Sequence, residues 1–305
     1  MTDEGHPLLG RRPSRYDRRR ALLQLALIAE AGAAIVLLRP AVLAARAAES
    51  PQPSTPSMGA MNSAPDSLVL GDGRTVHLLG LGGATTSDLL TRVAREIGGA
   101  VDAVVAFWGG DWHREIIIVA AGSDEQFRQL TRGPAGRQWV DVAAAAVADG
   151  VDPVRRTATG QRVVLAPGAF AMSDYALRIV LRHELFHFAS RADTALDAPR
   201  WLTEGVADFV GRPATPRPGP VSAATLATLP VDTDFDLSGA AQSLAYDRAW
   251  WFGRFVADTY GIATLRTFYL RAGGSGHPDP ATAMVEVLHA DEANLLARMQ
   301  HWLAA

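Results

Sequence analysis

The stretch "RHELFHFAS", residues 182–190, holds two histidines four residues apart, with a glutamate directly after the first. If this segment is helical, His183 and His187 lie one turn apart on the same side. Two neutral imidazoles placed in this way can both reach a tetrahedral zinc ion, while Glu184 points at the metal-bound water and not at the metal. The pattern therefore predicts a metal site with a base beside it. The alternative is a chance HExxH in an ordinary helix.

A catalytic zinc site usually has three protein ligands and one open position, so a third ligand should follow. The segment "APRWLTEGVADFVGRP", residues 198–213, has Pro199 near its start and Gly211 at its end, which predicts a second helix. Glu204 and Asp208 lie on one side of that helix, where two carboxylates repel each other unless a cation is near. We interpret Glu204 as the third ligand and Asp208 as the acceptor for the outer nitrogen of a ligand histidine. A solvated acidic face is the other interpretation.

The helix that carries HExxH should span residues 173–190, because Ser173 and Asp174 are good residues for a helix start. Apolar residues occupy most of its circumference, and only Arg178 and Arg182 mark a solvent-facing stripe. Such a helix is largely buried. Because isolated polar groups are costly in a buried place, the two histidines and the glutamate need partners there, and zinc would supply them.

The rest of the chain predicts an α+β fold with a small N-terminal β-sheet and a mostly helical C-terminal half. We expect a hairpin over residues 67–80 and a strand with a following helix over 114–133. A second hairpin is expected over 155–167, and its second arm, Arg162–Ala166, is a candidate edge strand that could bind an extended peptide. The further predicted helices span residues 87–109, 198–210, 241–260, 262–272, 279–289 and 291–303.

Composition excludes several kinds of chemistry. The chain of 305 residues has no cysteine, which rules out disulfides, thiolate zinc ligands and a cysteine nucleophile. Its formal net charge of -3 gives no basic field that would attract nucleic acid, so no nucleic-acid partner is expected. The length favours one main domain, which we place at residues 67–305.

The N-terminal residues predict membrane targeting. Residues 1–20 form an arginine-rich leader, expected on the cytoplasmic side, and an apolar run at 21–38 follows it. Residues 21–45 are interpreted either as an uncleaved membrane anchor or as a signal peptide cut after Ala45-Arg46-Ala47. Both interpretations place the main domain outside the cytoplasmic membrane, after a flexible linker at 46–66 rich in Pro and Ser. An amphipathic cytosolic helix is the third alternative for the apolar run.

HExxH together with the later Trp-Leu-x-Glu-Gly-x-Ala-Asp resembles the gluzincin metallopeptidases, the group that contains thermolysin and the membrane-alanyl-type aminopeptidases. The chain looks closest to the small, often membrane-anchored peptidase MA-like domains of bacteria. The resemblance implies a zincin-like (thermolysin-like) fold and one Zn²⁺ per chain, held by His183, His187 and Glu204. It also implies Glu184 as the general base, Asp208 as a support for one histidine, and a peptide or protein substrate.

The segment "LAYDRAWWFGRFVADTYG", residues 244–261, resembles the aminopeptidase segment whose tyrosine donates to the oxyanion, and Tyr246 stands in the matching place. A phenol can donate a hydrogen bond to a developing negative charge without carrying charge itself. The alternative is an ordinary tyrosine at a helix start, with its hydroxyl in water. Trp250, Trp251 and Phe255 are interpreted as core. The Gly-x-Met-Glu-Asn motif of the aminopeptidases is absent before HExxH, so recognition of a free amino end is not implied.

Two other interpretations stay open. The chain could be a non-catalytic module that kept the fold and binds cell-wall or protein ligands in its cleft, or its zinc could be structural. Three ligands with an adjacent glutamate resemble an open catalytic site more than a closed structural one. His113, after a Gly-Gly turn, and His277, in a loop, are interpreted as surface histidines and not as catalytic residues. His289 and His301 fall in predicted C-terminal helices without an acidic or histidine partner at ligand spacing, and they are assigned no role.

Overall fold

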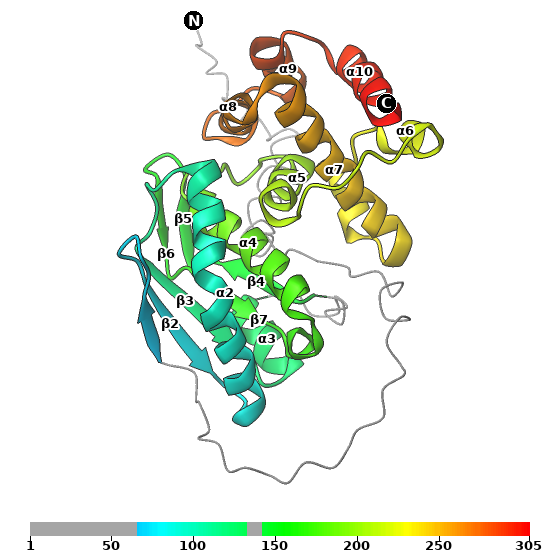
Figure 1. Cartoon of the computed structure of the whole chain (residues 1–305). Helices are drawn as coiled ribbons and strands as arrows, with labels where there is room; N and C mark the ends of the chain where they lie inside the picture. The colour runs from blue at the N-terminus through cyan, green and yellow to red at the C-terminus, as the bar shows by residue number, and fades with distance from the viewer. Residues whose placement is uncertain (1–65, 133–141) are drawn as a thin grey trace, which may run out of the picture.

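The computed structural model describes residues 66–132 and 142–305, and it shows a mixed α+β fold (Figure 1). The strands are β1 (Ser67–Val69), β2 (Thr75–Gly80), β3 (Glu115–Ala120), β4 (Ala144–Val147), β5 (Gly150–Asp152), β6 (Thr157–Thr159) and β7 (Arg162–Leu165). The α-helices are α2 (Ala84–Trp108), α3 (Asp124–Thr131), α4 (Asp174–Ser190), α5 (Arg200–Gly211), α6 (Pro220–Leu226), α7 (Gly239–Tyr260), α8 (Ile262–Gly273), α9 (Pro280–Leu288) and α10 (Glu292–Ala304). Two short 3₁₀ helices are η2 (Pro167–Ala171) and η3 (Asp232–Asp236).

The main sheet has five strands in the order β1-β2-β3-β7-β4. The three central strands run parallel, while β1 and β4 are antiparallel to their neighbours at the two edges. Strands β3 and β7 have buried apolar residues on both faces, as expected where helices or loops cover a sheet on both sides, whereas β2 buries only the face of Val76 and Leu78. The predicted hairpin over residues 67–80 is confirmed as β1 and β2, which are joined by the turn at Gly73.

The predicted hairpin over residues 155–167 is wrong. Its first arm, β6, pairs with β5 in a separate two-stranded sheet, and its second arm, β7, pairs with β3 on one side and β4 on the other. The candidate edge strand at Arg162–Ala166 is therefore internal, and the edge of the sheet is β4. The sequence hid this because β4 is a run of alanines and valine, which lacks the β-branched and aromatic pattern that marks a strand.

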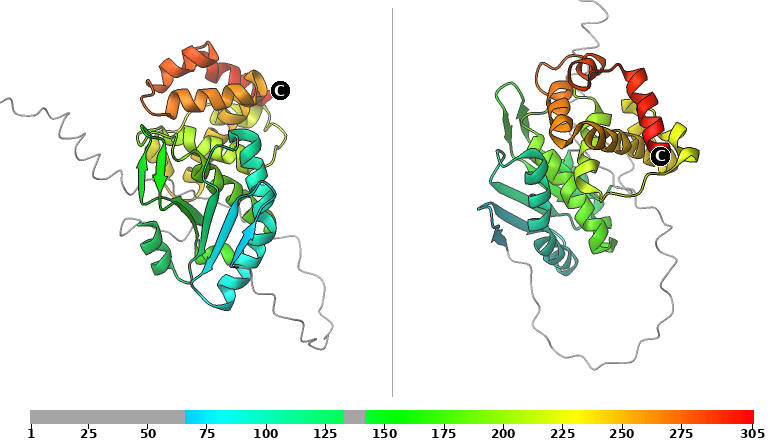
Figure 2. Two further views of the ribbon diagram at one scale, coloured as in Figure 1. Left: turned by 90° about the vertical axis from the view of Figure 1, so that its left-hand side faces the viewer. Right: turned by 45° about the horizontal axis from the view of Figure 1, so that its top comes forward.

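Helices α2 and α4 pack together on one face of the main sheet, and α3 lies on the other face (Figure 2). Ion pairs join the two long helices at separate turns: Arg178 Nε lies 2.7 Å from Glu96 Oε2, and Arg92 Nε lies 2.7 Å from Asp174 Oδ1. Arg92 also donates to the carbonyl oxygen of Phe170 at 3.0 Å, which ties η2 to α2. These contacts hold the start of α4 against α2.

The predicted start of α4 is confirmed. Ser173 is the N-cap, and its hydroxyl oxygen accepts a hydrogen bond from the backbone N–H of Ala176 at 3.2 Å. An Asp174 carboxylate in the first turn complements the positive end of the helix dipole. The remaining helices of the C-terminal half agree with the predicted ranges to within a few residues, except that α6 was not predicted. Trp250, Trp251 and Phe255 are buried, as expected.

Helix α5 lies between α4 and α7, and two glycines allow the close approach (Figure 1). A Cβ atom at Gly205 would lie 2.5 Å from the carbonyl oxygen of Ala249 on α7. A Cβ atom at Gly211 would lie 3.0 Å from the carbonyl oxygen of Ile179 on α4. The separation at Gly205 is shorter than a Cβ atom can tolerate, so that position requires glycine if α5 is to stay in contact with α7, and the separation at Gly211 is tight enough that a side chain there would need its neighbours to shift.

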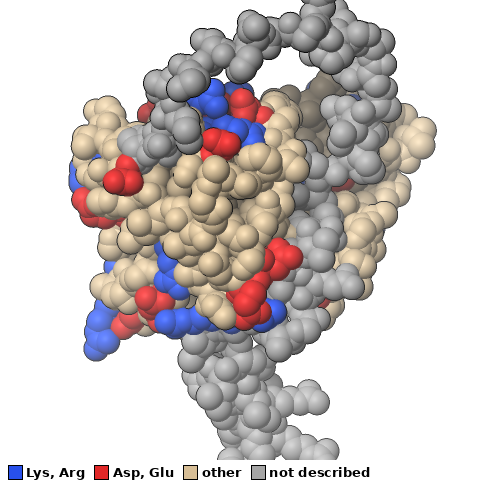
Figure 3. Space-filling view, turned by 90° about the horizontal axis from the view of Figure 1, so that it is seen from below, with Lys and Arg blue, Asp and Glu red and all other residues tan. Residues whose placement is uncertain are grey.

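The expectations for the leader, the targeting segment and the linker fall on residues 1–65, outside the described residues. Among residues 66–132 and 142–305, no helix has the length and apolar character needed to cross a membrane. Figure 3 shows one face of the molecule, where basic and acidic side chains lie beside one another at the margins of a broad uncharged area.

Candidate metal centre

Helix α4 places two imidazoles side by side in the interior. His183 is fully buried and His187 is 6% exposed. Their ring centroids are 4.8 Å apart, and the two Nε2 atoms approach to 3.1 Å. The close approach follows from the spacing of four residues on a regular helix, which puts both side chains on one side. The prediction that HExxH lies on a buried helix is confirmed.

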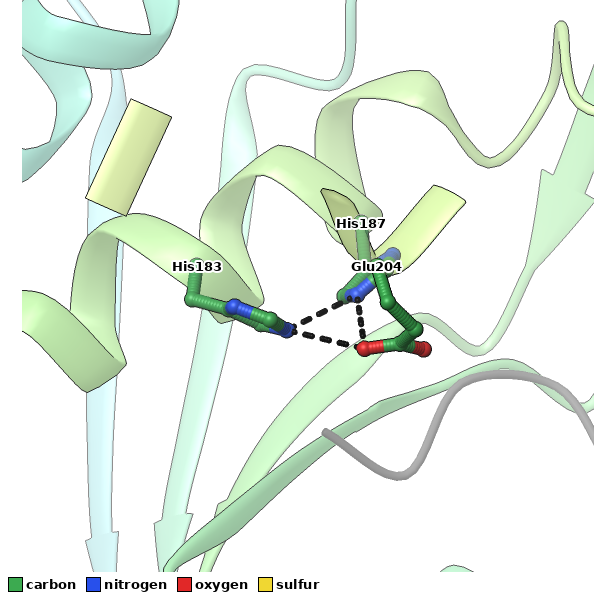
Figure 4. Close-up of side chains that lie close together, drawn as sticks. All are labelled: His183, His187 and Glu204. Carbon is green, nitrogen blue, oxygen red and sulfur yellow. Dashed lines mark hydrogen bonds and ion pairs between the residues drawn. The ribbon is translucent and has the colours of Figure 1, made fainter. Parts of the chain in front are cut away.

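Helix α5 brings Glu204 to the same point (Figure 4). Its Oε2 atom lies 3.3 Å from His183 Nε2 and 3.6 Å from His187 Nε2. Glu204 is 2% exposed. The three side chains, His183, His187 and Glu204, form a buried group that could hold a metal ion. The structure thus brings together the three residues that the sequence assigns as ligands.

The spacing of these atoms suits a small metal ion. Ligand atoms about 2.0–2.1 Å from a tetrahedral ion lie about 3.3–3.4 Å from one another, and the observed separations of 3.1, 3.3 and 3.6 Å scatter around this value. Among the described residues, Glu204 Oε2 is buried and has no hydrogen-bond partner of good geometry, with the two histidine Nε2 atoms at 3.3 and 3.6 Å. A buried carboxylate oxygen without a donor is unfavourable, so the geometry leaves a place for a cation between the three atoms.

Asp208 fixes the orientation of His183. The Nδ1 atom of His183 donates to Asp208 Oδ1 at 2.9 Å, so its Nε2 atom is directed at His187 and Glu204. Asp208 in turn forms an ion pair of 2.5 Å with Arg212, and Arg212 forms another of 2.9 Å with Asp247. This arrangement agrees with the predicted role of Asp208, because a carboxylate on the outer nitrogen sets the tautomer of a ligand histidine.

In the metal-free protein the electrostatic environment favours the protonated form of His183. Burial alone lowers the pKa of His183, but the Asp208 and Glu204 carboxylates outweigh it and raise that pKa to about 10. Burial lowers the pKa of His187, and the Glu204 carboxylate offsets only part of that effect. Burial opposes ionisation of Glu204, yet the two histidines bring its pKa below the ordinary value. A divalent cation would therefore bind in competition with a proton on His183.

Glu184 lies on α4 directly after His183 and is fully buried. Its Oε2 atom accepts a hydrogen bond of 2.7 Å from the backbone N–H of Ala146 in β4, and its Oε1 atom has no partner within residues 66–132 and 142–305. Burial raises the pKa of Glu184 to about 8, although the positive charge of His183 acts in the opposite direction. One carboxylate oxygen is thus held by the sheet edge while the other is free to accept a proton.

Arg191 was missed by sequence reasoning. It lies four residues after His187, and its Nη2 atom donates to the carbonyl oxygen of Ala146 at 2.8 Å. Its Nε atom is buried and has no partner in the part of the chain that the structure describes. Burial lowers the pKa of Arg191, and Tyr269, Glu184 and Glu204 act against that effect. Its spacing from His187 and His183 by one and two helical turns is the signal that could have pointed to it.

Tyr246 lies on α7 and is 2% exposed, with its ring packed edge-on against Phe235 at 5.0 Å. Its predicted oxyanion role stays a prediction. The alternative of an ordinary tyrosine that reaches into water is wrong, because Tyr246 belongs to the core. His113 Nε2 contacts the carbonyl oxygen of Ala158, and His277 contacts Asp197, so neither joins the metal-binding group.

Comparison with known proteins gives no relative. No family model matches the chain, and neither a curated protein nor a solved structure matches it. The interpretation of the site therefore depends on the residues and their geometry.

Proposed function

We propose that this chain is a zinc-dependent metallopeptidase of the gluzincin type, with a zincin-like fold and one Zn²⁺ held by His183, His187 and Glu204. The observation that carries the proposal is the meeting of three ligand atoms at 3.1–3.6 Å, beside a glutamate whose second oxygen is unpaired. A buried set of two imidazoles and one carboxylate is the ligand set of catalytic zinc in thermolysin-like sites. The sequence order, HExxH and then Glu on the next helix, supports the same class.

The donor set favours zinc over the alkaline-earth metals. Magnesium and calcium prefer oxygen ligands and higher coordination numbers, whereas two of the three ligand atoms here are imidazole nitrogens. The absence of cysteine from the whole chain excludes a thiolate site. Asp208, paired with Arg212, would raise the basicity of His183 as a ligand.

In this proposal Glu184 is the general base. Zinc, when bound, supplies Lewis acidity that polarises the substrate carbonyl and lowers the pKa of a water toward neutrality. Glu184 accepts the proton of the attacking water on its free oxygen and then passes it to the leaving amine. Ala146 holds the other oxygen in place through its N–H. A pKa of about 8 in the metal-free protein lies close to neutral pH, where a group can both take and give a proton.

Tyr246 is proposed as the donor that stabilises the oxyanion of the tetrahedral intermediate. Replacing it with Phe removes only the hydroxyl and leaves the packing against Phe235 in place. We expect kcat to fall about 10²–10³-fold with zinc content unchanged. Full turnover by the Tyr246→Phe protein would remove this residue from the mechanism.

The substrate is proposed to be a peptide or protein outside the cytoplasmic membrane, reached from an N-terminal anchor or after secretion. N-terminal sequencing of the membrane-associated and soluble forms tests this. An intact N-terminus in the membrane fraction supports the anchor, and a start after Ala47 supports cleavage. Accumulation of the whole chain in the cytosol would contradict both versions.

The decisive experiment is metal analysis and peptide cleavage by the purified chain. About one zinc per chain, together with cleavage of a peptide library that the Glu184→Gln protein cannot perform, is the expected result. The rival function is a non-catalytic binding module, and the complete burial of Glu184 is the observation that favours it. Bound zinc without cleavage of any peptide would support that rival.

A further inference from the structure

We propose that Arg191 binds a carboxylate group of the substrate beside the metal centre, so that the enzyme selects peptides with a carboxylate near the scissile bond. This inference rests on the proposed peptidase function and adds a substrate class to it. Two features carry it, namely the place of Arg191 next to Glu184 and the lack of an ion-pair partner for Arg191 within the described residues.

The position of Arg191 follows from one residue of the sheet edge. Ala146 in β4 donates its N–H to Glu184 at 2.7 Å and accepts from Arg191 at its carbonyl oxygen at 2.8 Å. In an extended strand the N–H and C=O of one residue point to the same side. The guanidinium group of Arg191 and the carboxylate of Glu184 are therefore neighbours on that side of β4.

Two acidic residues near Arg191 in the sequence or the fold pair with other arginines. Asp208 pairs with Arg212, and Asp193, two residues after Arg191, pairs with Arg156 at 2.5 Å. Within the described part of the chain Arg191 forms no ion pair within 4.0 Å and bonds only to a neutral carbonyl oxygen, so no carboxylate of these residues is paired with its guanidinium group.

A guanidinium that has no ion-pair partner among the described residues, and whose buried Nε–H has no acceptor there, is suited to an anion. Its planar set of donors matches the two oxygens of a carboxylate, and such charge-assisted hydrogen bonds are the strong ones. Arg191 is half-buried, unlike the fully buried His183 and Glu184, so part of its side chain lies at the surface although its Nε atom is buried. A peptide offers a carboxylate at its C-terminus or on an Asp or Glu side chain.

Binding to the zinc-loaded full chain carrying Glu184→Gln, which prevents cleavage, tests the proposal. Three labelled peptides serve as probes. The first two share one sequence and end in a free carboxylate or in an amide, and the third is the amidated peptide with a single Gln changed to Glu. We expect fluorescence anisotropy to show roughly tenfold or greater preference for at least one carboxylate peptide over the neutral peptide. The first and third peptides distinguish the two sources of the carboxylate.

Adding Arg191→Gln should reduce this preference to less than about twofold, and Arg191→Lys should retain part of it, because Lys keeps the charge but not the planar fork. The preference is a ratio of two affinities measured on the same protein. Partial unfolding of a variant lowers binding of both peptides equally, so it cannot by itself abolish the preference. Arg182→Gln is the matched control on the same helix, on the side that faces Glu96. It should leave the preference unchanged.

Two outcomes would overturn the proposal. One is equal affinity for all three peptides, and the other is a preference that survives Arg191→Gln, which would place the carboxylate on the metal or elsewhere. Cleavage by the otherwise unaltered enzyme separates this inference from the proposed function. If no peptide is cleaved but binding of the carboxylate depends on Arg191, the carboxylate site stands and the peptidase proposal fails. If peptides with and without a carboxylate are cleaved equally well, the peptidase proposal stands and the carboxylate site fails.

Discussion

Asp208 on α5 accepts the Nδ1–H of His183 on α4 at 2.9 Å, and this bond joins the two helices that supply the metal-binding group. It determines which nitrogen of His183 faces His187 and Glu204. The orientation of the centre is thus set by a residue that contributes no ligand atom.

Replacing Asp208 with Asn should weaken zinc binding about 10–100-fold while leaving the protein folded, because the amide keeps the shape but is a poorer acceptor for His183. Zinc affinity measured by competition with a chelator gives the result. Asp258→Asn, an exposed change on α7, is the control. Equal affinity in the Asp208→Asn protein and the unaltered protein would mean that the contact has no influence on the metal.

Replacing His187 or Glu204 with Ala should remove the metal. The unaltered chain is expected to hold about one zinc, and each variant should hold less than about a tenth of that, because two remaining ligands bind zinc weakly. Elemental mass spectrometry measures the content. His301→Ala, on the exposed side of α10, should retain full zinc. Zinc that stays in the Glu204→Ala protein would exclude Glu204 as a ligand.

Replacing Glu184 with Gln should retain zinc and abolish peptide cleavage, by about 10³-fold or more. The amide oxygen can still accept the N–H of Ala146, so the local structure is preserved while the base is lost. The comparison needs zinc content and kcat/KM for the same preparation. Measurable turnover near that of the unaltered protein would reject Glu184 as the base.

Replacing Gly205 with Ala should destabilise the protein by about 1–3 kcal/mol and lower its zinc affinity. The added Cβ atom would lie 2.5 Å from the carbonyl oxygen of Ala249 on α7, so α5 would have to shift together with Glu204. Gly98→Ala in the interior of α2 has open space and should stabilise the protein by about 0.5–1 kcal/mol. Urea unfolding of both variants measures the difference, and a neutral Gly205→Ala change would show that α5 can move freely.

The metal-free protein should lose stability as the pH rises above 7. The folded-state pKa values of His183, about 10, and Glu184, about 8, both exceed the ordinary values of 6.5 and 4.5. The folded state therefore binds more protons, and this stabilisation is full below the ordinary values and is lost as the pH rises through the folded ones. The slope is at most about 1.4 kcal/mol per pH unit for each group.

Urea unfolding between pH 7 and 10, with a chelator or with zinc, tests this dependence. Zinc should flatten the slope, since His183 Nε2 then binds metal and not a proton. The lowered pKa values of His187 and Glu204 act in the acid range and leave this window unaffected. Stability that is flat or rising with pH in the metal-free protein would contradict the electrostatic description of the centre.

The sequence predicted the metal-binding group because its residues lie on two amphipathic helices, whose periodicity and end signals are local. Ser173 and Gly211 mark helix ends, and the four-residue spacing brings His183 beside His187 without reference to the rest of the fold. The sheet was harder to predict, since strand order depends on contacts between distant segments. The residues of β4 carry no local signal that the strand pairs with β7. The hydrogen bond from Ala146 to Glu184 can be inferred only when that pairing is known.

The two hydrogen bonds at Ala146 also affect the tendency of the protein to aggregate at high protein concentration. An open sheet edge offers unpaired backbone groups to any other chain, which promotes intermolecular strand pairing and aggregation. Here the side chains of Glu184 and Arg191 occupy both backbone groups of Ala146 on edge strand β4. Glu184 and Arg191, which are proposed to act on a substrate, therefore also prevent another chain from pairing with β4 at Ala146.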